Sequence, residues 1–392
     1  MNNTLPAQDT SKGVYSIALS QFGLAFCFNV VMAFMPFHIT KISPYKPSET
    51  MLWIGMIMGL NSFISAAVAP FWGSLTSKFR PKSLFEKAFL FNGIIFLLMG
   101  FTGSLPMLLG LRLIQGALGG ASTIGLFMIS QLSPKDRLAA DLSIFQGSMT
   151  AGQLLGPPVG AYAAAHMGYR SPFILSFLLV GFCLLLSHLY VVDVPKKATD
   201  RDRKIHFNPG LLWGWALIFI ATIHLTFLPS ILPYVLKGFD LVGEKALKSA
   251  GFIMMGYTAT ALIGNYVISR LTPRAKLKGV IAVLCLTSAF LQFLLYFSGG
   301  LIGFATIRML QTGVIAAVIP MTMANSGSRL GGTGLGFLNS ARFAGNGFGP
   351  LMATSVVAGS NLLTLYLLIA LSTVGSVLAF LITGRKTRLE KR

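Results

Sequence analysis

Three arginines and one histidine lie inside long apolar stretches of this chain: Arg112, Arg308, Arg342 and His224. A charged side chain inside a bilayer is costly unless it faces protein or water, so such residues often mark the path of a solute or an ion. An arginine can hold an anion or donate to a neutral acceptor. A histidine can gain or lose a proton near neutral pH. These residue types therefore suggest solute recognition and proton transfer within a membrane.

The Arg112 pattern occurs twice. Residues 111–115 read LRLIQ and residues 307–311 read IRMLQ, so Arg112 shares a helix face with Gln115, and Arg308 with Gln311. Three further patterns of the first half recur in the second half in the same order. Residues 152–157 correspond to 345–350, residues 34–36 to 227–229, and residues 73–82 to 264–274. A membrane protein built from two similar halves can hold a solute between them, near the middle of the bilayer. The repeat therefore favours transport.

Composition places the chain in the lipid bilayer. The 392 residues are 54% hydrophobic and only 11% charged, with a mean hydropathy of +0.72, whereas a soluble domain carries roughly a quarter charged residues. A transmembrane helix needs about 20 apolar residues, and the continuous apolar runs are too long for barrel strands. Twelve stretches qualify: 14–39, 51–72, 84–102, 106–130, 138–162, 172–191, 211–236, 248–269, 276–297, 300–325, 334–357 and 361–383.

We therefore expect an all-α integral membrane protein with twelve transmembrane helices in two pseudo-symmetric six-helix bundles. The N-terminal bundle covers 1–191, a polar cytoplasmic linker covers 192–210, and the C-terminal bundle covers 211–392. The third, sixth, ninth and twelfth stretches are almost entirely apolar and are expected to face lipid.

The net charge of +20 does not indicate a nucleic-acid partner, because of where the charge lies. Most of the 31 Lys and Arg residues fall in segments on the side of the termini. This bias predicts a multi-pass protein of the inner membrane with both termini in the cytoplasm. Anionic lipid headgroups account for the excess of basic residues. Cys27, Cys183 and Cys285 have no spacing that suggests a metal site or disulfide, and we expect no metal and no cofactor.

A glycine motif occupies the fifth stretch. Gly152, Gly156 and Gly160 recur every four residues, which makes a flat stripe for close helix packing. Pro157 removes a backbone donor and bends the helix, so this segment could act as a gate hinge. Polar residues on neighbouring faces could line a cavity. These polar candidates are Asn29, Gln146, Gln153, Asn339 and Arg342. The matching glycine motif of the second half consists of Gly345, Gly349 and Pro350.

The motifs together resemble the major facilitator superfamily, specifically its twelve-helix drug:proton antiporter branch. Residues 108–116 match the pattern l-x-x-x-R-x-x-q-G, and residues 152–160 match G-x-x-x-G-P-x-x-G, which is associated with exporters. The loop after the second helix matches G-x-L-x-D-R-x-G-R-K at Gly73, Lys78 and Lys82. The resemblance implies a charge-based latch at the aspartate of that pattern, and Ser77, which carries no charge, stands in its place.

The acidic residues bear on proton coupling. All eleven lie in loops, tails or near helix ends, so the chain lacks the mid-membrane carboxylate that many proton-coupled relatives use. His224 is the main candidate for proton coupling, and Asp141, at the cytoplasmic end of the fifth helix, is a second one.

The resemblance and the residues together predict a secondary active transporter, with proton-coupled efflux of small amphipathic compounds by alternating access. The alternative is a dedicated transporter of one anionic metabolite, such as a carboxylate siderophore or an organic acid, which the arginines would suit. No HExxH, GxSxG or P-loop pattern occurs, so we expect no enzyme. The expected partners are a small-molecule solute, the lipid bilayer and protons, with the chain acting as a monomer.

Overall fold

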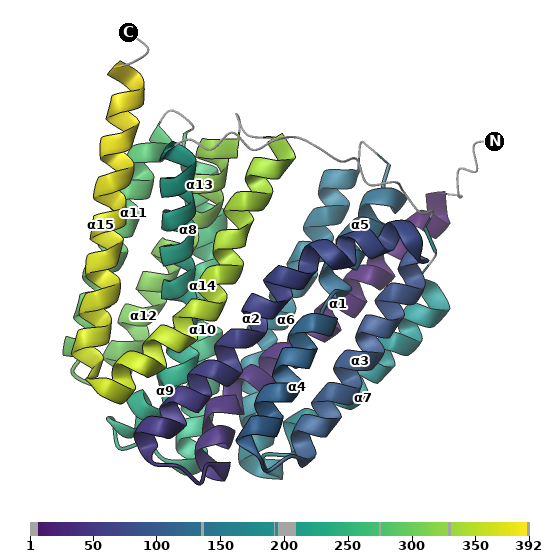
Figure 1. Ribbon diagram of the computed structural model, residues 1–392, viewed down its shortest axis with the longest axis horizontal. Helices are drawn as coiled ribbons and strands as arrows, with labels where there is room; N and C mark the ends of the chain where they lie inside the picture. Colours follow the sequence, from purple (N-terminus) through teal and green to yellow (C-terminus); the bar gives the residue numbers. More distant parts are fainter. Residues whose placement is uncertain are drawn as a thin grey trace. The chain divides into compact units, whose positions relative to one another are not determined.

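The computed structural model describes residues 7–134, 137–191, 193–194, 209–273, 276–327 and 331–389, and nearly all of these residues are helical (Figure 1). The bilayer offers no water to pair with backbone groups, so spanning segments bond internally as helices. The helices are α1 (Ala7–Ile42), α2 (Pro47–Lys78), α3 (Pro81–Phe101), α4 (Leu105–Leu118), α5 (Ala121–Leu132), α6 (Leu138–Met167), α7 (Ser171–Tyr190), α8 (Pro209–Thr226), α9 (Leu228–Lys237), α10 (Gly243–Leu271), α11 (Leu277–Leu294), the 3-10 turn η2 (Leu295–Phe297), α12 (Leu301–Ala316), α13 (Val318–Gly327), α14 (Gly331–Gly359) and α15 (Leu362–Leu389).

In the described residues these helices group into the twelve predicted segments, which confirms the fold class. Ten stretches are long and apolar enough to span a membrane; the glycine-rich α6 and α14 are the two segments outside this set. Three predicted helices are interrupted, giving the pairs α4 with α5, α8 with α9, and α12 with α13. The chain is thus a multi-pass membrane protein.

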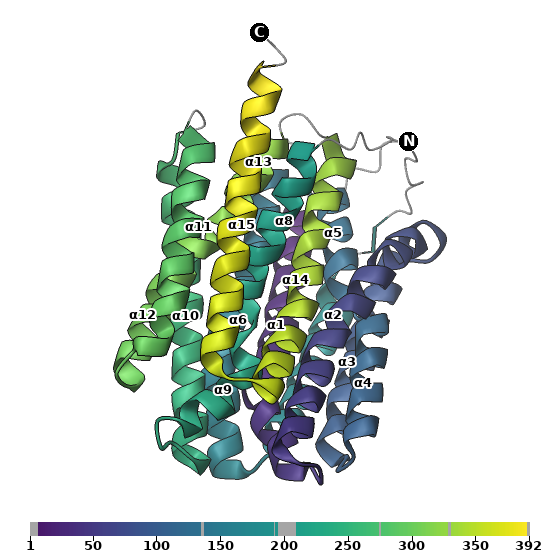
Figure 2. The ribbon, with the colours of Figure 1, turned by 60° about the vertical axis from the view of Figure 1, so that its left-hand side comes forward.

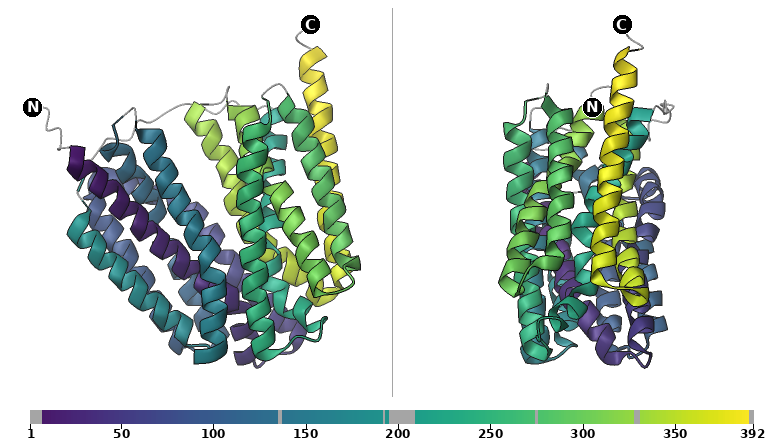
Figure 3. Two further views of the ribbon diagram at one scale, coloured as in Figure 1. Left: turned by 180° about the vertical axis from the view of Figure 1, so that it is seen from behind. Right: turned by 90° about the vertical axis from the view of Figure 1, so that its left-hand side faces the viewer.

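Contacts divide the chain into two compact units. The first contains 1–43, 64–201 and 243–252, and the second contains 44–63, 202–242 and 253–392. Most of the predicted linker 192–210 lies outside the described residues. Within the first unit α1 packs on α6 (Figure 2) and on α7, and α3 packs on α7 (Figure 1). Within the second unit α8 packs on α14, and α11 packs on α15 (Figure 3). The two units therefore repeat the same helix pairings.

The glycine stripe explains how closely α6 approaches α1. A Cβ atom at Gly152 would lie 2.6 Å from the carbonyl oxygen of Phe22, and one at Gly160 would lie 2.8 Å from Cα of Val30. In the second unit a Cβ at Gly345 would lie 2.8 Å from the carbonyl oxygen of Phe219 on α8. Only glycine permits backbone contact of this kind.

The interruptions have local causes. Gly119 and Gly120 separate α4 from α5, and the ring of Trp72 fills the space where Gly120 lacks a side chain. Nε1 of Trp72 donates to the carbonyl of Ala117 at 2.8 Å, so this carbonyl stays paired next to the break. Pro229 lies just after the break between α8 and α9. A proline has no N–H to donate to the carbonyl four residues earlier, so it interrupts the helix here.

Two expectations about boundaries were wrong. The loop predicted to open at Gly73 is mostly helix, because α2 continues to Lys78 and only Phe79 and Arg80 precede α3 at Pro81. Gly264, which corresponds to Gly73 in the second half, lies inside α10 and within the predicted stretch 248–269. Both glycines therefore lie inside long helices. In addition, α1 starts at Ala7, before the apolar stretch that predicted it.

Candidate functional site

The second unit contains a hydrogen-bonded cluster of fully buried polar side chains. Arg308 and Gln311 come from α12, His224 from α8, Gln292 from α11 and Thr373 from α15, and each has a relative exposure of 0%. We call these five residues the Arg308 cluster. It joins residues up to 149 positions apart in the sequence. The helix pairings of the second unit therefore build a polar centre inside an apolar bundle.

Arg308 is held by one amide, one carbonyl and two aromatic rings. Its Nη1 donates to Oε1 of Gln311 at 2.5 Å, and its Nη2 points at the carbonyl oxygen of Leu225 at 3.5 Å. The guanidinium carbon lies 4.8 Å from the ring centroid of Phe227 and 5.0 Å from that of Tyr257. Aromatic faces attract a cation, more strongly when it is desolvated.

Pro229 explains why the Leu225 carbonyl is available. In a regular helix the N–H of residue 229 would bond to the carbonyl of residue 225, but a proline has no N–H. The repeated pattern Phe-x-Pro thus prepares an acceptor for the buried guanidinium. In the first half Pro36 stands four residues after Met32 in the same way.

The Arg308 cluster continues from Gln311 to His224. Nε2 of Gln311 donates to Oε1 of Gln292 and lies 3.0 Å from Nδ1 of His224. Nε2 of His224 lies 2.9 Å from Oγ1 of Thr373, whose hydroxyl donates to the carbonyl of Ile369 at 2.7 Å. Because the Gln311 amide nitrogen can only donate, Nδ1 of His224 accepts and its Nε2 carries the proton. His224 is therefore neutral in this arrangement.

Several hydrogen-bond donors in and beside this cluster have no acceptor. Nε of Arg308, Nε2 of Gln292 and the hydroxyl of Tyr366 are buried without a hydrogen-bond partner in the part of the chain that the structure describes. No salt bridge to Arg308 occurs among the described residues either. Buried polar groups are normally paired, and a buried charge normally has a counter-charge. The cluster thus has unused capacity to bind acceptor oxygens.

Arg112 and Gln115 form the corresponding pair in the first unit. Nη1 of Arg112 donates to Oε1 of Gln115 at 2.8 Å, and its Nη2 lies 2.7 Å from the sulfur of Met32. Both residues are buried, and Nε2 of Gln115 has no partner among the described residues. The pair therefore repeats the Arg308–Gln311 geometry.

The hydrogen bonds that the structure gives for the other predicted cavity residues lie within a single helix. Asn29 donates to the carbonyl of Ala25 on its own helix at 2.8 Å, and Arg342 lies 3.5 Å from Oδ1 of Asn339. Gln146 and Arg342 are exposed, and Gln153 is half-buried. The described contacts do not bring these five residues into one group with Arg112 or Arg308.

The predicted gate and coupling residues occupy helix interiors and ends. Gly156 and Pro157 lie where α6 crosses α1, and Gly349 and Pro350 lie in α14, where Oγ1 of Thr226 would contact a Cβ at Gly349. Asp141 is buried in the first turn of α6, a favourable place for a carboxylate near the helix N-terminus.

Two members of the Arg308 cluster, Gln292 and Thr373, and the neighbouring Tyr366 were not predicted as site residues. Gln292 had a signal, because it is an isolated amide in an otherwise apolar helix. Thr373 and Tyr366 had none, because a threonine or tyrosine in a transmembrane helix is ordinary, and their positions depend on how α15 packs on α8. No group of three His, Cys, Asp or Glu side chains that could hold a metal occurs in the described residues.

Comparisons with known proteins agree with this architecture. A family model described as Major Facilitator Superfamily matches residues 17–350. The protein named "Multidrug resistance protein MdtG" of Escherichia fergusonii is 25% identical over 359 residues, covering 88% of this chain and 87% of its own length. The protein of the same name in Klebsiella pneumoniae is 24% identical over 358 residues, covering 88% and 86%.

Two solved structures share the fold. A D-xylose-proton symporter superposes with a TM-score of 0.74 at 15% identity, covering 94% of this chain and 96% of the symporter. The human organic anion transporter MFSD10 superposes with a TM-score of 0.71 at 15% identity, covering 96% and 100%. The family predicted from the motifs is confirmed.

Proposed function

Because this chain belongs to the Major Facilitator Superfamily, we propose that it is a proton-coupled exporter of small amphipathic compounds that works by alternating access. The multidrug-resistance names of its relatives support this proposal, since their similarity covers most of both chains. The distribution of basic residues supports an inner-membrane location with cytoplasmic termini. The proposed partners are the solute, protons and lipid, with no cofactor and no nucleic acid, and the chain is proposed to act as a monomer.

The observation that carries the proposal is the Arg308 cluster. A guanidinium is held between Phe227 and Tyr257, with donors left over on Arg308, Gln292 and Tyr366. Aromatic faces with a few convergent polar groups are typical of sites for small organic ligands. A solute with an apolar body and a carbonyl, hydroxyl or anionic group would fit this chemistry.

The orientation of Gln311 supports the proposal of proton coupling. A second proton on His224 would place an N–H donor at Nδ1 against the N–H donor of Gln311, 3.0 Å away. The Gln311 amide would have to turn its oxygen toward His224, and its nitrogen would then face Nη1 of Arg308, which is also a donor. The charged form of His224 and the Arg308–Gln311 hydrogen bond therefore exclude each other. Solute affinity at Arg308 thus depends on one proton.

The same geometry favours a second candidate, a dedicated transporter of one anionic metabolite. Charging His224 would release Nη1 of Arg308 and place two positive charges in one buried centre. Isolated buried charges are strongly unfavourable, and an anionic solute would relieve them. Such a solute would bind together with the proton, whereas an exporter exchanges the two.

Uptake into inside-out vesicles with an acidic interior separates the candidates. We expect gradient-dependent accumulation of several chemically unrelated amphipathic compounds, because protons leave the vesicle as solute enters. Uptake of one organic anion alone, driven by the opposite gradient, would support the dedicated transporter. Uptake that ignores the gradient, in vesicles that contain correctly inserted protein, would contradict both.

A further inference from the structure

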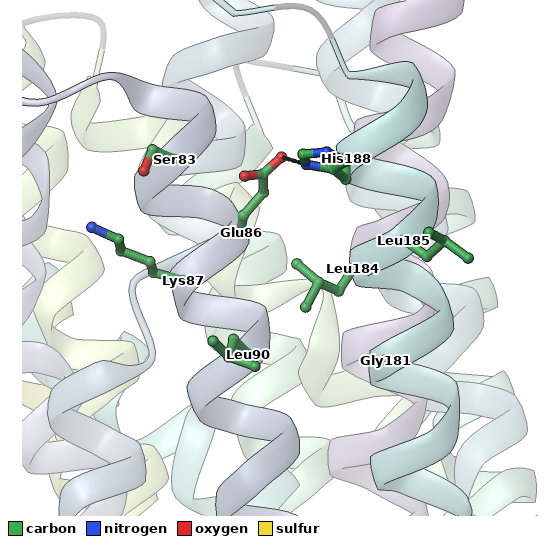
Figure 4. Close-up of a pocket in the computed structure, with 8 residues that line it drawn as sticks. All are labelled: Ser83, Glu86, Lys87, Leu90, Gly181, Leu184, Leu185 and His188. Atoms are coloured by element: carbon green, nitrogen blue, oxygen red, sulfur yellow. Dashed lines mark hydrogen bonds and ion pairs between the residues drawn. The ribbon is translucent and has the colours of Figure 1, made fainter.

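A groove of about 440 Å³ lies between α3 and α7 in the first unit (Figure 4). Both helices belong to the apolar segments that are expected to face lipid. We call this feature the α3–α7 groove. It is lined by Ser83, Glu86, Lys87, Leu90, Gly181, Leu184, Leu185 and His188.

The α3–α7 groove changes from polar to apolar along its length. Ser83 and Lys87 lie in the first two turns of α3, and His188 lies in the last turn of the antiparallel α7. Leu90 and Gly181 lie deeper along the same two helices. From Ser83 to Leu90 a helix rises by about 10 Å. This gradient resembles that of a phospholipid, with a polar headgroup at the membrane surface and acyl chains below.

Some of the charged side chains at the polar end of the groove are paired with other groups of the protein. Oε1 of Glu86 lies 3.2 Å from Nδ1 of His188 and 3.9 Å from Nζ of Lys82. Nζ of Lys82 also donates to the carbonyl of His188 at 2.8 Å. Glu86 and His188 point toward one another, and Lys87 extends from another side of α3 (Figure 4). Lys87 is exposed, with no hydrogen bond or ion pair among the described residues. The ammonium group of Lys87 therefore remains available to bind an anion.

The apolar end has room for a chain of methylene groups. A Cβ atom at Gly181 would meet nothing within 4 Å, and the side chains of Leu90 and Leu185 are 46% and 53% exposed. Further along the pair, a Cβ at Gly93 would lie 3.4 Å from Cγ1 of Val180, so the helices pack closely there. An acyl chain lying over Gly181 would cover apolar surface and end where the two helices meet.

We propose that the α3–α7 groove binds one anionic phospholipid, with its phosphate group at Lys87 and one acyl chain over Gly181. A lysine near the membrane surface attracts an anionic headgroup. An ethanolamine headgroup would need a free carboxylate for its ammonium, and Glu86 is already occupied by Lys82 and His188. The groove therefore favours a phosphatidylglycerol-type headgroup over a zwitterionic one. This proposal is independent of the proposed transport function.

Titration of palmitoyl-oleoyl phosphatidylglycerol into the purified full-length protein, followed by native mass spectrometry, tests the proposal. The Lys87→Ala variant should bind the first lipid about fivefold more weakly, as expected for losing one lysine near an anionic headgroup. Gly181→Phe should also weaken binding, because its ring fills the apolar end. Neither position packs against a neighbour in a way that folding requires, and unchanged gel-filtration and melting profiles would verify this.

The matched controls are Lys278→Ala and Gly279→Phe in the first turn of α11. Lys278 is exposed, and a Cβ at Gly279 would meet nothing within 4 Å. These variants should bind phosphatidylglycerol as the unaltered protein does. If the two groove variants and the two α11 controls lose phosphatidylglycerol binding equally, the proposed site is wrong. Full phosphatidylglycerol binding by both Lys87→Ala and Gly181→Phe would also overturn it. Equal affinity for palmitoyl-oleoyl phosphatidylethanolamine would overturn the headgroup assignment.

Discussion

Nη2 of Arg308 points at the carbonyl oxygen of Leu225, 3.5 Å away, and Pro229 is the residue that leaves this carbonyl without its helical donor. A proline that follows the apolar run of α8 therefore contributes to the environment of a charge on α12. The link between these two distant sequence features suggests how substitutions should separate folding from transport.

Replacing Pro229 with Ala should restore an N–H that competes with Arg308 for the Leu225 carbonyl. We expect unchanged or higher thermal stability, because a helical hydrogen bond is regained, together with several-fold slower transport. Thermal unfolding in detergent and vesicle uptake measure the two effects. Pro172→Ala, in the first turn of α7, is the matched control, because a proline there has no helical bond to restore. Equal transport by both variants would refute the role of Pro229.

Replacing Arg308 with Met should abolish transport while leaving the melting temperature the same or higher. A buried cation without a carboxylate partner is costly, and an apolar side chain of similar length removes that cost. The Arg112→Ala variant should also lose transport while still inserting into the membrane. A large fall in melting temperature with transport retained would instead make Arg308 a structural residue.

Replacing His224 with Gln should flatten the dependence of transport on external pH. A glutamine can replace the hydrogen bonds to Gln311 and Thr373 but cannot take up a proton in this pH range. His38→Gln is the control, since His38 is also a buried histidine of a membrane helix, packed among Phe34 and Phe173. If His224→Gln keeps the original pH profile, another group carries the proton.

Replacing Gly160 with Val should destabilise the first unit by about 1–3 kcal/mol, the usual cost of overpacking a close contact. The added methyl groups would meet the backbone of Val30 on α1. Thermal unfolding would measure the effect. Gly147→Ala in the same helix is the control, because a Cβ there would meet nothing within 4 Å. If both variants melt alike, α6 does not approach α1 as closely as described.

The sequence predicted the fold well because the bilayer demands long apolar helices, and such runs are visible in the sequence. It also predicted the Arg308–Gln311 pair, because residues three apart share a helix face whatever the tertiary structure. His224 was predicted as a site residue from its position alone. Its contact with Gln311 could not be predicted, because it depends on how α8 packs against α12.

Other parts of the site could not be predicted, for physical reasons. Gln146 and Arg342 were expected to line a cavity and both are exposed, but a helix face alone does not say which neighbour it meets. Gly73 was read as the start of a loop, but it lies inside α2. A glycine costs about 1 kcal/mol in a helix interior, which a membrane-spanning helix tolerates. Thr373 completes the Arg308 cluster from a segment that was expected to be almost entirely apolar.

The most direct test is the internal pH of acid-loaded inside-out vesicles when a transported solute is added. If the Arg308 cluster exchanges the solute for a proton, the interior should become more alkaline as soon as the solute enters. The Arg308→Met variant, inserted to the same level, should give no response. An interior pH that stays constant during uptake, or an equal response from Arg308→Met, would contradict the account.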